Sequence, residues 1–252
     1  RRGKVPITEM LLDELHDDAP VRQVLMGAFW TAVVLDTDPV QCGLASTLRG
    51  QTDHQGPPIP EAGELLSYSA RQLAQWLGAA ETLKASVGLA AYNALLNADE
   101  RSAVELNASQ VIMDQGAAGS VAIIGHFPFV DEVRRAAERC WVLELRPRPG
   151  DVPADRADEL LPQADVVAIT STSLINHTFD ELIRLCRDDA LVIMLGPSTP
   201  LSPVLLDAGV DVLSGTVVQD VDRVLQSISQ GATFRQIKHR GGLRLITMAY
   251  EG

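Results

Sequence analysis

Five short apolar segments in the second half of the chain constrain its fold most tightly. They follow one another at intervals of about 20 to 25 residues, with helical segments between them: VAIIG, CWVLEL, DVVAIT, ALVIML and VDVLSG. Continuous apolar runs of this length are typical of strands that are buried on both faces. The pattern predicts β-α units that build a parallel sheet with helices on both faces, and LRLITM is predicted to add a sixth strand at the edge.

Composition supports an α/β fold and narrows the class of ligand. Aromatic residues make up only 4% of the chain, so the core must be built mainly from Ala, Val, Leu and Ile. The 33 acidic residues exceed the 21 basic ones, and the resulting net charge of -12 argues against a broad nucleic-acid or anionic-membrane surface. We therefore expect a small-molecule ligand, with no nucleic-acid or membrane partner.

The cysteines and the N-terminus predict a cytoplasmic protein. Cys42, Cys140 and Cys186 lie far apart without a C-x-x-C pair, which favours neither a disulfide framework nor a zinc ribbon. The N-terminus lacks the apolar region of a signal peptide, and no apolar run approaches the roughly 18 residues that a membrane span needs.

The first third of the chain predicts a smaller α+β domain. A short helix precedes two strand-like runs, residues 21–35 and 40–48, which the turn-forming DTDP separates into a β-hairpin. The polar loop of residues 49–63 follows and carries His54. Ser69 and Gln72 form a capping box that starts a helix running to about Leu77.

A second helix is predicted from Leu83 to Ala94, where apolar residues recur at helical spacing. Its small residues Gly88 and Ala91 allow another element to approach closely. The polar stretch of residues 107–120 separates this region from the parallel sheet, so we expect an α+β domain at residues 1–106 and an α/β domain at residues 107–252.

Polar loops follow the predicted parallel strands, whose carboxyl ends meet at one edge of the sheet. Side chains and backbone N–H groups there could form a cradle for an anion or another polar ligand. The candidate ligand-binding residues are Gly125, His126, Phe127, Thr172, Asn176, Ser198 and Thr199. In the alternative interpretation these polar groups only cap helices, as the capping box of Thr178 with Glu181 and the N-cap Ser202 before Pro203 suggest.

The loop after the first parallel strand departs from a dinucleotide-binding turn. Gly125 stands alone where three glycines are needed, although Glu144 lies about 20 residues further on, where a ribose-binding acid would be. Glu144 is therefore the candidate cofactor-binding residue of a nucleoside-containing cofactor, such as S-adenosylmethionine or a dinucleotide. Alternatively, it pairs with Arg146 or Arg148.

Three histidines, His54, His126 and His177, lie in predicted loops and are the candidate metal ligands. None has H-x-x-x-H spacing, so a metal site would be assembled from separate loops, with Cys42, Asp53 or a bound chelator supplying further ligands. In the alternative interpretation each histidine caps or packs. The chain has no G-x-S-x-G, P-loop or H-E-x-x-H motif, and no catalytic residue is assigned.

Several local patterns, in one order from about residue 20 to 230, resemble a known family. They are CGLASTL at 42–48, Ala62-Gly63, VGLAAYNALL at 87–96, VAIIGHFP at 121–128, TSLINHT at 172–178, LGPSTPLSP at 195–203, and the closing Gly209-Val210-Asp211 and Ser214-Gly215. The sequence resembles the "putative heavy-metal chelation" family, in which an enolase-N-terminal-like domain precedes a Rossmann-like domain. This resemblance implies metal handling and a site in the cleft between the domains.

Three hypotheses follow. In the first, the cleft binds a small polar or metal-chelating molecule, with a transition metal or metal chelate as the bound group, and His126, Asn176 and His177 face it. In the second, the chain is a Rossmann-type enzyme that uses a nucleoside-containing cofactor. In the third, it is a non-catalytic homo-oligomeric module, joined through the helix around Gly88 and Ala91.

Overall fold

A computed structural model describes residues 5–50, 56–96, 108–117 and 119–249. Its larger sheet has the strand order β10-β9-β8-β7-β4-β5-β6, and every neighbouring pair is parallel except β9 and β10. The strands are β4 (Ser120–Ile124), β5 (Arg139–Glu144), β6 (Val152–Pro153), β7 (Val166–Thr170), β8 (Leu191–Leu195), β9 (Val212–Val218) and β10 (Leu243–Ala249). The predicted α/β fold is confirmed, including the edge position of the segment near the C-terminus.

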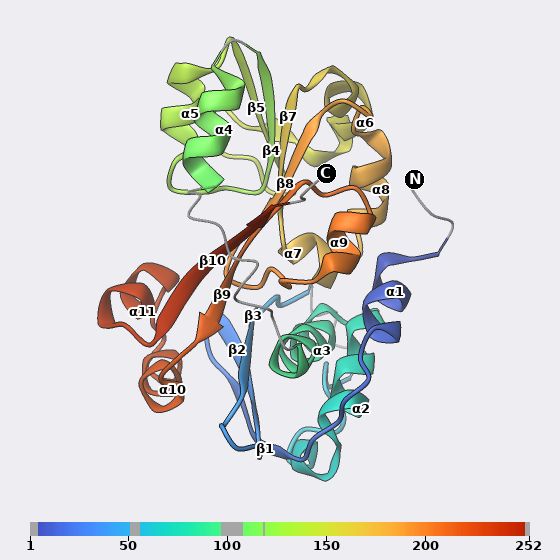
Figure 1. The fold of residues 1–252 in the computed structure, drawn as a ribbon, viewed down its shortest axis with the longest axis vertical. Coiled ribbons are helices and arrows are strands. Elements are labelled where there is room, and N and C mark those ends of the chain that lie inside the picture. The colour runs from blue at the N-terminus through green and yellow to red at the C-terminus, as the bar shows by residue number, and fades with distance from the viewer. Residues whose placement is uncertain (1–4, 51–55, 97–107, 118, 250–252) are drawn as a thin grey trace.

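Helices cover both faces of this sheet, as predicted. α4 and α5 pack on one face, and α6, α8 and α9 lie on the other (Figure 1). The helices of this region are α4 (Ala108–Gly116), α5 (Val130–Ala136), α6 (Ala157–Leu160), α7 (Thr172–Ile175), α8 (Phe179–Leu185), α9 (Pro203–Asp207), α10 (Val221–Ser229) and α11 (Phe234–Arg240).

Two predicted helix starts in this region have different outcomes. Ser202 caps α9, because its Oγ accepts a hydrogen bond from the Val204 N–H at 3.1 Å and Pro203 occupies the first turn. The predicted capping box of Thr178 with Glu181 is wrong. The Thr178 hydroxyl instead donates to Asn176 Oδ1 at 2.8 Å, so the side chain turns away from the helix that it precedes.

The first part of the chain forms a three-stranded antiparallel sheet rather than the predicted hairpin. Its order is β1 (Val21–Met26), β2 (Trp30–Leu35) and β3 (Cys42–Ser46). The single predicted strand over residues 21–35 is broken by a turn in which the Gly27 N–H donates to the Trp30 carbonyl at 2.8 Å. α10 packs against the start of this turn, because a Cβ at Gly27 would lie 2.7 Å from the Ile228 carbonyl oxygen. The next two residues, Ala28 and Phe29, are apolar and exposed, so the turn lacks the polar residues that usually mark one.

Three helices accompany the small sheet: α1 (Ile7–Asp13), α2 (Ala70–Ala74) and α3 (Thr82–Leu95). The capping box of Ser69 and Gln72 is confirmed, and a 3-10 turn, η2 (Gln75–Gly78), completes the segment predicted to end near Leu77. Shorter 3-10 turns are η1 (Leu65–Ser67), η4 (Ala154–Arg156) and η5 (Leu161–Gln163).

The small residues of α3 serve packing within the chain. A Cβ at Gly88 would lie 2.1 Å from the Leu77 backbone nitrogen, and one at Gly43 would lie 2.1 Å from the Ala90 carbonyl oxygen. Ala91 is also fully buried. This surface is thus covered by η2 and β3 of the same chain, and the structure gives no support to the prediction that Gly88 and Ala91 join two copies.

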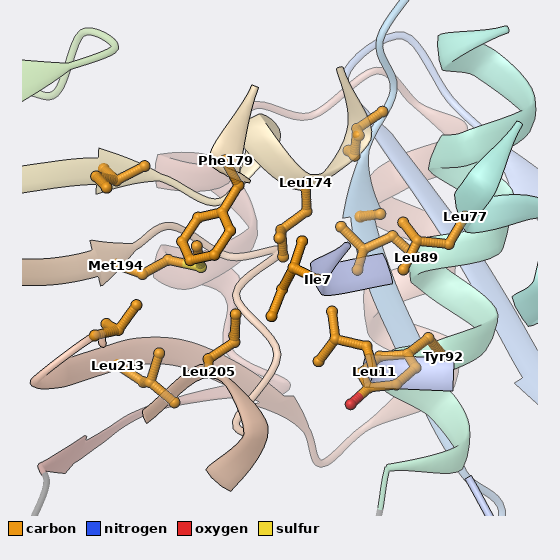
Figure 2. Packing of buried hydrophobic residues seen from close by; sticks show 14 of the residues in the cluster. Ile7, Leu11, Leu77, Leu89, Tyr92, Leu174, Phe179, Met194, Leu205 and Leu213 are labelled. Carbon is orange, nitrogen blue, oxygen red and sulfur yellow. The ribbon is translucent and has the colours of Figure 1, made fainter. Parts of the chain in front are cut away.

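One hydrophobic core runs through both parts of the chain. Figure 2 shows Phe179, Met194, Leu205 and Leu213 on one side and Leu77, Leu89 and Tyr92 on the other, with Ile7 and Leu11 of α1 between them. Asp180 of α8 also accepts a hydrogen bond from the Ile7 N–H at 3.1 Å. α1 therefore joins the large sheet to the small one.

A second connection lies on the opposite face of the small sheet. Val224, Ile228 and Ile237 of α10 and α11 pack against Ala32 and Leu44 of β2 and β3. In Figure 1 the antiparallel pair β9 and β10 extends from the large sheet toward α10 and α11, which connect the two strands, and α10 lies beside β1 and β2.

The predicted boundary between residues 106 and 107 lies outside the described residues. Among the residues that are described, no helix is long and apolar enough to cross a membrane.

Candidate binding pocket

A pocket of about 1220 Å³ lies where the carboxyl ends of the parallel strands face the small sheet and α11. The loops after β4, β7 and β8 supply one wall, and residues of β2, β3, β9, β10, α4 and α11 supply the others. Its described lining residues are Trp30, Ser46, Ala108, Ser109, His126, Phe127, Pro128, Phe129, Thr170, Ser171, Thr172, Leu195, Gly196, Pro197, Ser214, Thr233, Phe234, Arg235, Lys238, Arg244, Leu245, Ile246 and Thr247. This is the edge of the sheet at which the polar loops were predicted to meet.

The loop after β4 brings a histidine and two aromatic rings to the pocket. Gly125 itself does not line it but makes the turn, with a φ of 102° that other residues rarely adopt. The rings of Phe127 and Phe129 stack in parallel, with centroids 5.3 Å apart. The His126 side chain is 26% exposed, and its Nδ1 lies 3.7 Å from Asp151 Oδ2.

Asp151 is a nearly buried carboxylate behind His126. Its side chain is 1% exposed, and it accepts hydrogen bonds from Arg134 Nη2 at 2.7 Å and from the Arg148 N–H at 3.0 Å. Burial opposes ionisation, but these hydrogen bonds, with the charges of His126 and Arg134, outweigh it and lower the pKa of Asp151 below its usual range. A negative charge therefore stands behind the imidazole of the pocket wall.

Of the three predicted site residues in the loop after β7, one lines the pocket and two do not. Thr172 lines the pocket, and its Oγ1 lies 3.0 Å from Thr170 Oγ1. Asn176 is not among the described lining residues, because its Oδ1 accepts the hydrogen bonds of Thr178. His177, with a positive φ of 60°, places Nε2 2.8 Å from the Ala79 carbonyl oxygen of the first part of the chain. The structure thus does not bring His126 and His177 together in the pocket.

The loop after β8 reaches the pocket through Gly196 and Pro197 rather than through its hydroxyl residues. Ser198 Oγ accepts a hydrogen bond from the Ser46 N–H at 2.8 Å and so ties β3 to the large sheet. Thr199 is also buried, and its Oγ1 has no hydrogen-bond partner. Ser198 and Thr199 therefore lie behind the described pocket lining.

Glu144 ends β5 beside Pro153 of β6, and it is not among the described lining residues. The pocket is formed around β4, β7, β8 and the antiparallel pair β9 and β10, whereas β5 and β6 occupy the other end of the sheet. The geometry therefore gives no support to a ribose contact by Glu144.

The candidate metal ligands do not form a cluster in the described part of the chain. His54 lies outside the described residues, and within the described residues no group of three His, Cys, Asp or Glu side chains could hold a metal ion. Burial raises the pKa of Cys42 to about 12 and that of Cys140 to about 11, so both stay protonated at neutral pH. A protonated thiol is a poor metal ligand.

Sequence reasoning missed the cationic wall of the pocket. Arg235 and Lys238 come from α11 and Arg244 from β10, and all three are exposed. No Asp or Glu is among the described lining residues, although the chain carries a net charge of -12. The sequence feature that could have predicted this wall is the cluster of basic residues at 235–240 together with Arg244, which is unusual in such an acidic chain.

The fold and pocket define an α/β protein in which a Rossmann-like sheet and a small α+β unit enclose one site. Residues 107–247 match the model of the DUF364 family and residues 8–96 match that of the DUF4213 family; both are described as "Putative heavy-metal chelation". The chain therefore belongs to the DUF364 family, which confirms the predicted resemblance.

Two solved structures of the family share the whole fold. A protein of unknown function from Desulfitobacterium hafniense has a TM-score of 0.81 at 25% identity, with 97% of each chain covered. One from Pyrococcus horikoshii has a TM-score of 0.82 at 19% identity, with 97% of this chain and 98% of that chain covered. An uncharacterized protein of Methanocaldococcus jannaschii is 26% identical over 157 residues, which span 58% of this chain and 59% of that relative.

Proposed function

We propose that the pocket binds a small organic anion of the kind that chelates transition metals, and that a metal enters it already chelated. The main support is the charge of the pocket lining. Its described residues include three basic side chains and no carboxylate, although the chain has a net charge of -12. Such a local excess of positive charge attracts an anion and opposes a bare cation.

The polar groups of the pocket suit the oxygens of such an anion. Four residues with hydroxyl groups line the same pocket as the basic side chains: Ser46, Thr170, Thr172 and Ser214. Hydroxyls donate hydrogen bonds to carboxylate or phosphate oxygens, and hydrogen bonds from Arg and Lys to such groups are stronger than neutral ones. A small molecule with two or more acidic groups fits this arrangement.

The ligand chemistry argues for a chelate over a bare metal ion. A transition-metal site built by the protein needs several imidazole, thiolate or carboxylate ligands. His126 is the one imidazole among the described lining residues, and Cys42 and Cys140 stay protonated. In this proposal the chelator supplies most ligands and His126 completes the coordination. A cytoplasmic location belongs to the same proposal, supported by the free thiols of Cys42 and Cys140.

Isothermal titration calorimetry with three probes tests the proposal: Ni²⁺ alone, citrate alone, and the Ni²⁺–citrate complex. We expect citrate and its complex to bind at one site. The double variant Arg235→Ala/Lys238→Ala should weaken both by about tenfold or more, since the loss of even one charge-assisted hydrogen bond costs ~1.5–3 kcal/mol. Arg22→Ala is the matched control, because it removes one exposed positive charge from β1, away from the pocket.

Two results would overturn the proposal. One is tight stoichiometric binding of Ni²⁺ alone with no binding of either anion. The other is anion binding that the double variant leaves at the wild-type affinity. Native mass spectrometry of gently purified protein complements the titration, because it weighs whatever molecule remains bound.

A further inference from the structure

The few aromatic residues of this chain gather at the pocket. The sequence has three Trp, three Tyr and five Phe residues, and four of these line the pocket: Trp30, Phe127, Phe129 and Phe234. They come from β2, the loop after β4 and α11, which are far apart in the sequence. Local sequence composition therefore does not account for their concentration.

Phe127, Phe129 and Trp30 pack against the core with only part of their surface. Within the described residues, the core is almost entirely aliphatic, and Tyr92 and Phe179 are its fully buried aromatic residues. The four pocket residues are only partly buried. Partly exposed aromatic rings that gather around one pocket point to contact with a molecule that the chain does not contain.

The rings form two groups on different walls of the pocket. Phe127 and Phe129 stack with an interplanar angle of 8° on the loop after β4. Trp30 and Phe234 meet at 58°, with centroids 5.8 Å apart, where β2 approaches α11. Trp30 Nε1 is buried and has no hydrogen-bond partner.

Charge and aromatic surface are joined on α11. Phe234 is followed directly by Arg235, and Lys238 lies one turn further along the same helix; all three line the pocket. A ligand that contacts this helix meets an aromatic ring and two cations together. Aromatic side chains favour stacked or edge-to-face contact with a flat ring, and cations favour acidic groups.

We infer that the ligand of this pocket is a flat aromatic or heteroaromatic molecule that carries acidic groups. Its ring packs between the two aromatic groups, and its acidic groups meet Arg235 and Lys238. This inference rests on the proposed function, since it specifies the class of organic anion that the same pocket takes.

A matched pair of dianions tests the inference by calorimetry on the full chain. Benzene-1,3-dicarboxylate and cis-cyclohexane-1,3-dicarboxylate carry the same two carboxylates on a six-membered ring, and they differ in flatness and aromaticity. We expect the aromatic dianion to bind about tenfold more tightly, since favourable ring contacts contribute at this level. The double variant Phe127→Leu/Phe129→Leu is expected to abolish this preference while keeping apolar side chains at both positions.

Phe29→Leu is the matched control, because Phe29 is half exposed and is not among the described lining residues. Equal affinity for the two dianions would overturn the inference, and so would an aromatic preference that survives in the double variant. If neither dianion binds but citrate does, and the Arg235/Lys238 variant weakens citrate, the inference fails and the proposed function stands. If no anion binds, both fail. Unchanged melting temperatures show that the variants remain folded.

Discussion

Gly88→Ala tests the contact that holds α3 against η2. In the structure a Cβ at position 88 would lie 2.1 Å from the Leu77 nitrogen and 2.5 Å from the Trp76 carbonyl carbon, so the two backbones must separate by more than about 1 Å. Overpacking of this kind costs about 1–3 kcal/mol or more, while replacing glycine in a helix interior returns up to about 1 kcal/mol. Because the clash is with backbone and not with a movable side chain, we expect a net loss of about 2 kcal/mol.

Thermal unfolding measures this loss. For a chain of this size a change of 1 kcal/mol shifts Tm by roughly 2–4 °C, so Tm should fall by about 4–8 °C. Gly78→Ala is the matched control, because a Cβ there meets nothing within 4 Å, and its Tm should hardly change. An unchanged Tm for Gly88→Ala would refute the packing argument. Dissociation of an oligomer without loss of monomer stability would instead restore the intermolecular role of this helix.

Three further predictions concern buried polar groups. The pKa of Asp151 is lowered in the folded chain, so its carboxylate stabilises the fold above the unfolded pKa of about 4, and this stabilisation is lost as the pH falls through the folded pKa. The difference in Tm between the wild type and Asp151→Asn should therefore shrink below about pH 4. Tyr92→Phe removes the hydroxyl that donates to Glu14, and urea unfolding should show a loss of about 1 kcal/mol. Cys42 and Cys140, with raised pKa values, should react with a thiol reagent at pH 8 at least ~100-fold more slowly in the folded protein than in guanidinium.

The large sheet was predictable because its signals are local. Each parallel strand is an apolar run between helical segments, and burial on both faces makes such a run recognisable without knowledge of its neighbours. The turn at Gly27 was not predictable, because Ala28 and Phe29 that follow are apolar and provide none of the polar residues that local rules recognise. The capping box at Thr178 failed because its hydroxyl donates to Asn176 Oδ1 and accepts no hydrogen bond from the first turn of α8.

The candidate site was predictable in part. His126, Phe127 and Thr172 follow parallel strands, and the rule that these strand ends share one edge places them in one pocket. Asn176 and His177 lie in the same loop as Thr172, yet their hydrogen bonds turn them toward Thr178 and Ala79. Loop position alone does not determine where a side chain points.

The sequence by itself determined the α/β class, the order of most strands and helices, and the sheet edge at which polar loops meet, because periodicity and capping are properties of neighbouring residues. Only the tertiary structure decided the charge and shape of the pocket. Arg235 and Lys238 reach it because α10 and α11 pack on the small sheet, and Trp30 reaches it from the opposite end of the chain. Contacts between segments separated by about 200 residues leave no spacing in the sequence that local rules can recognise.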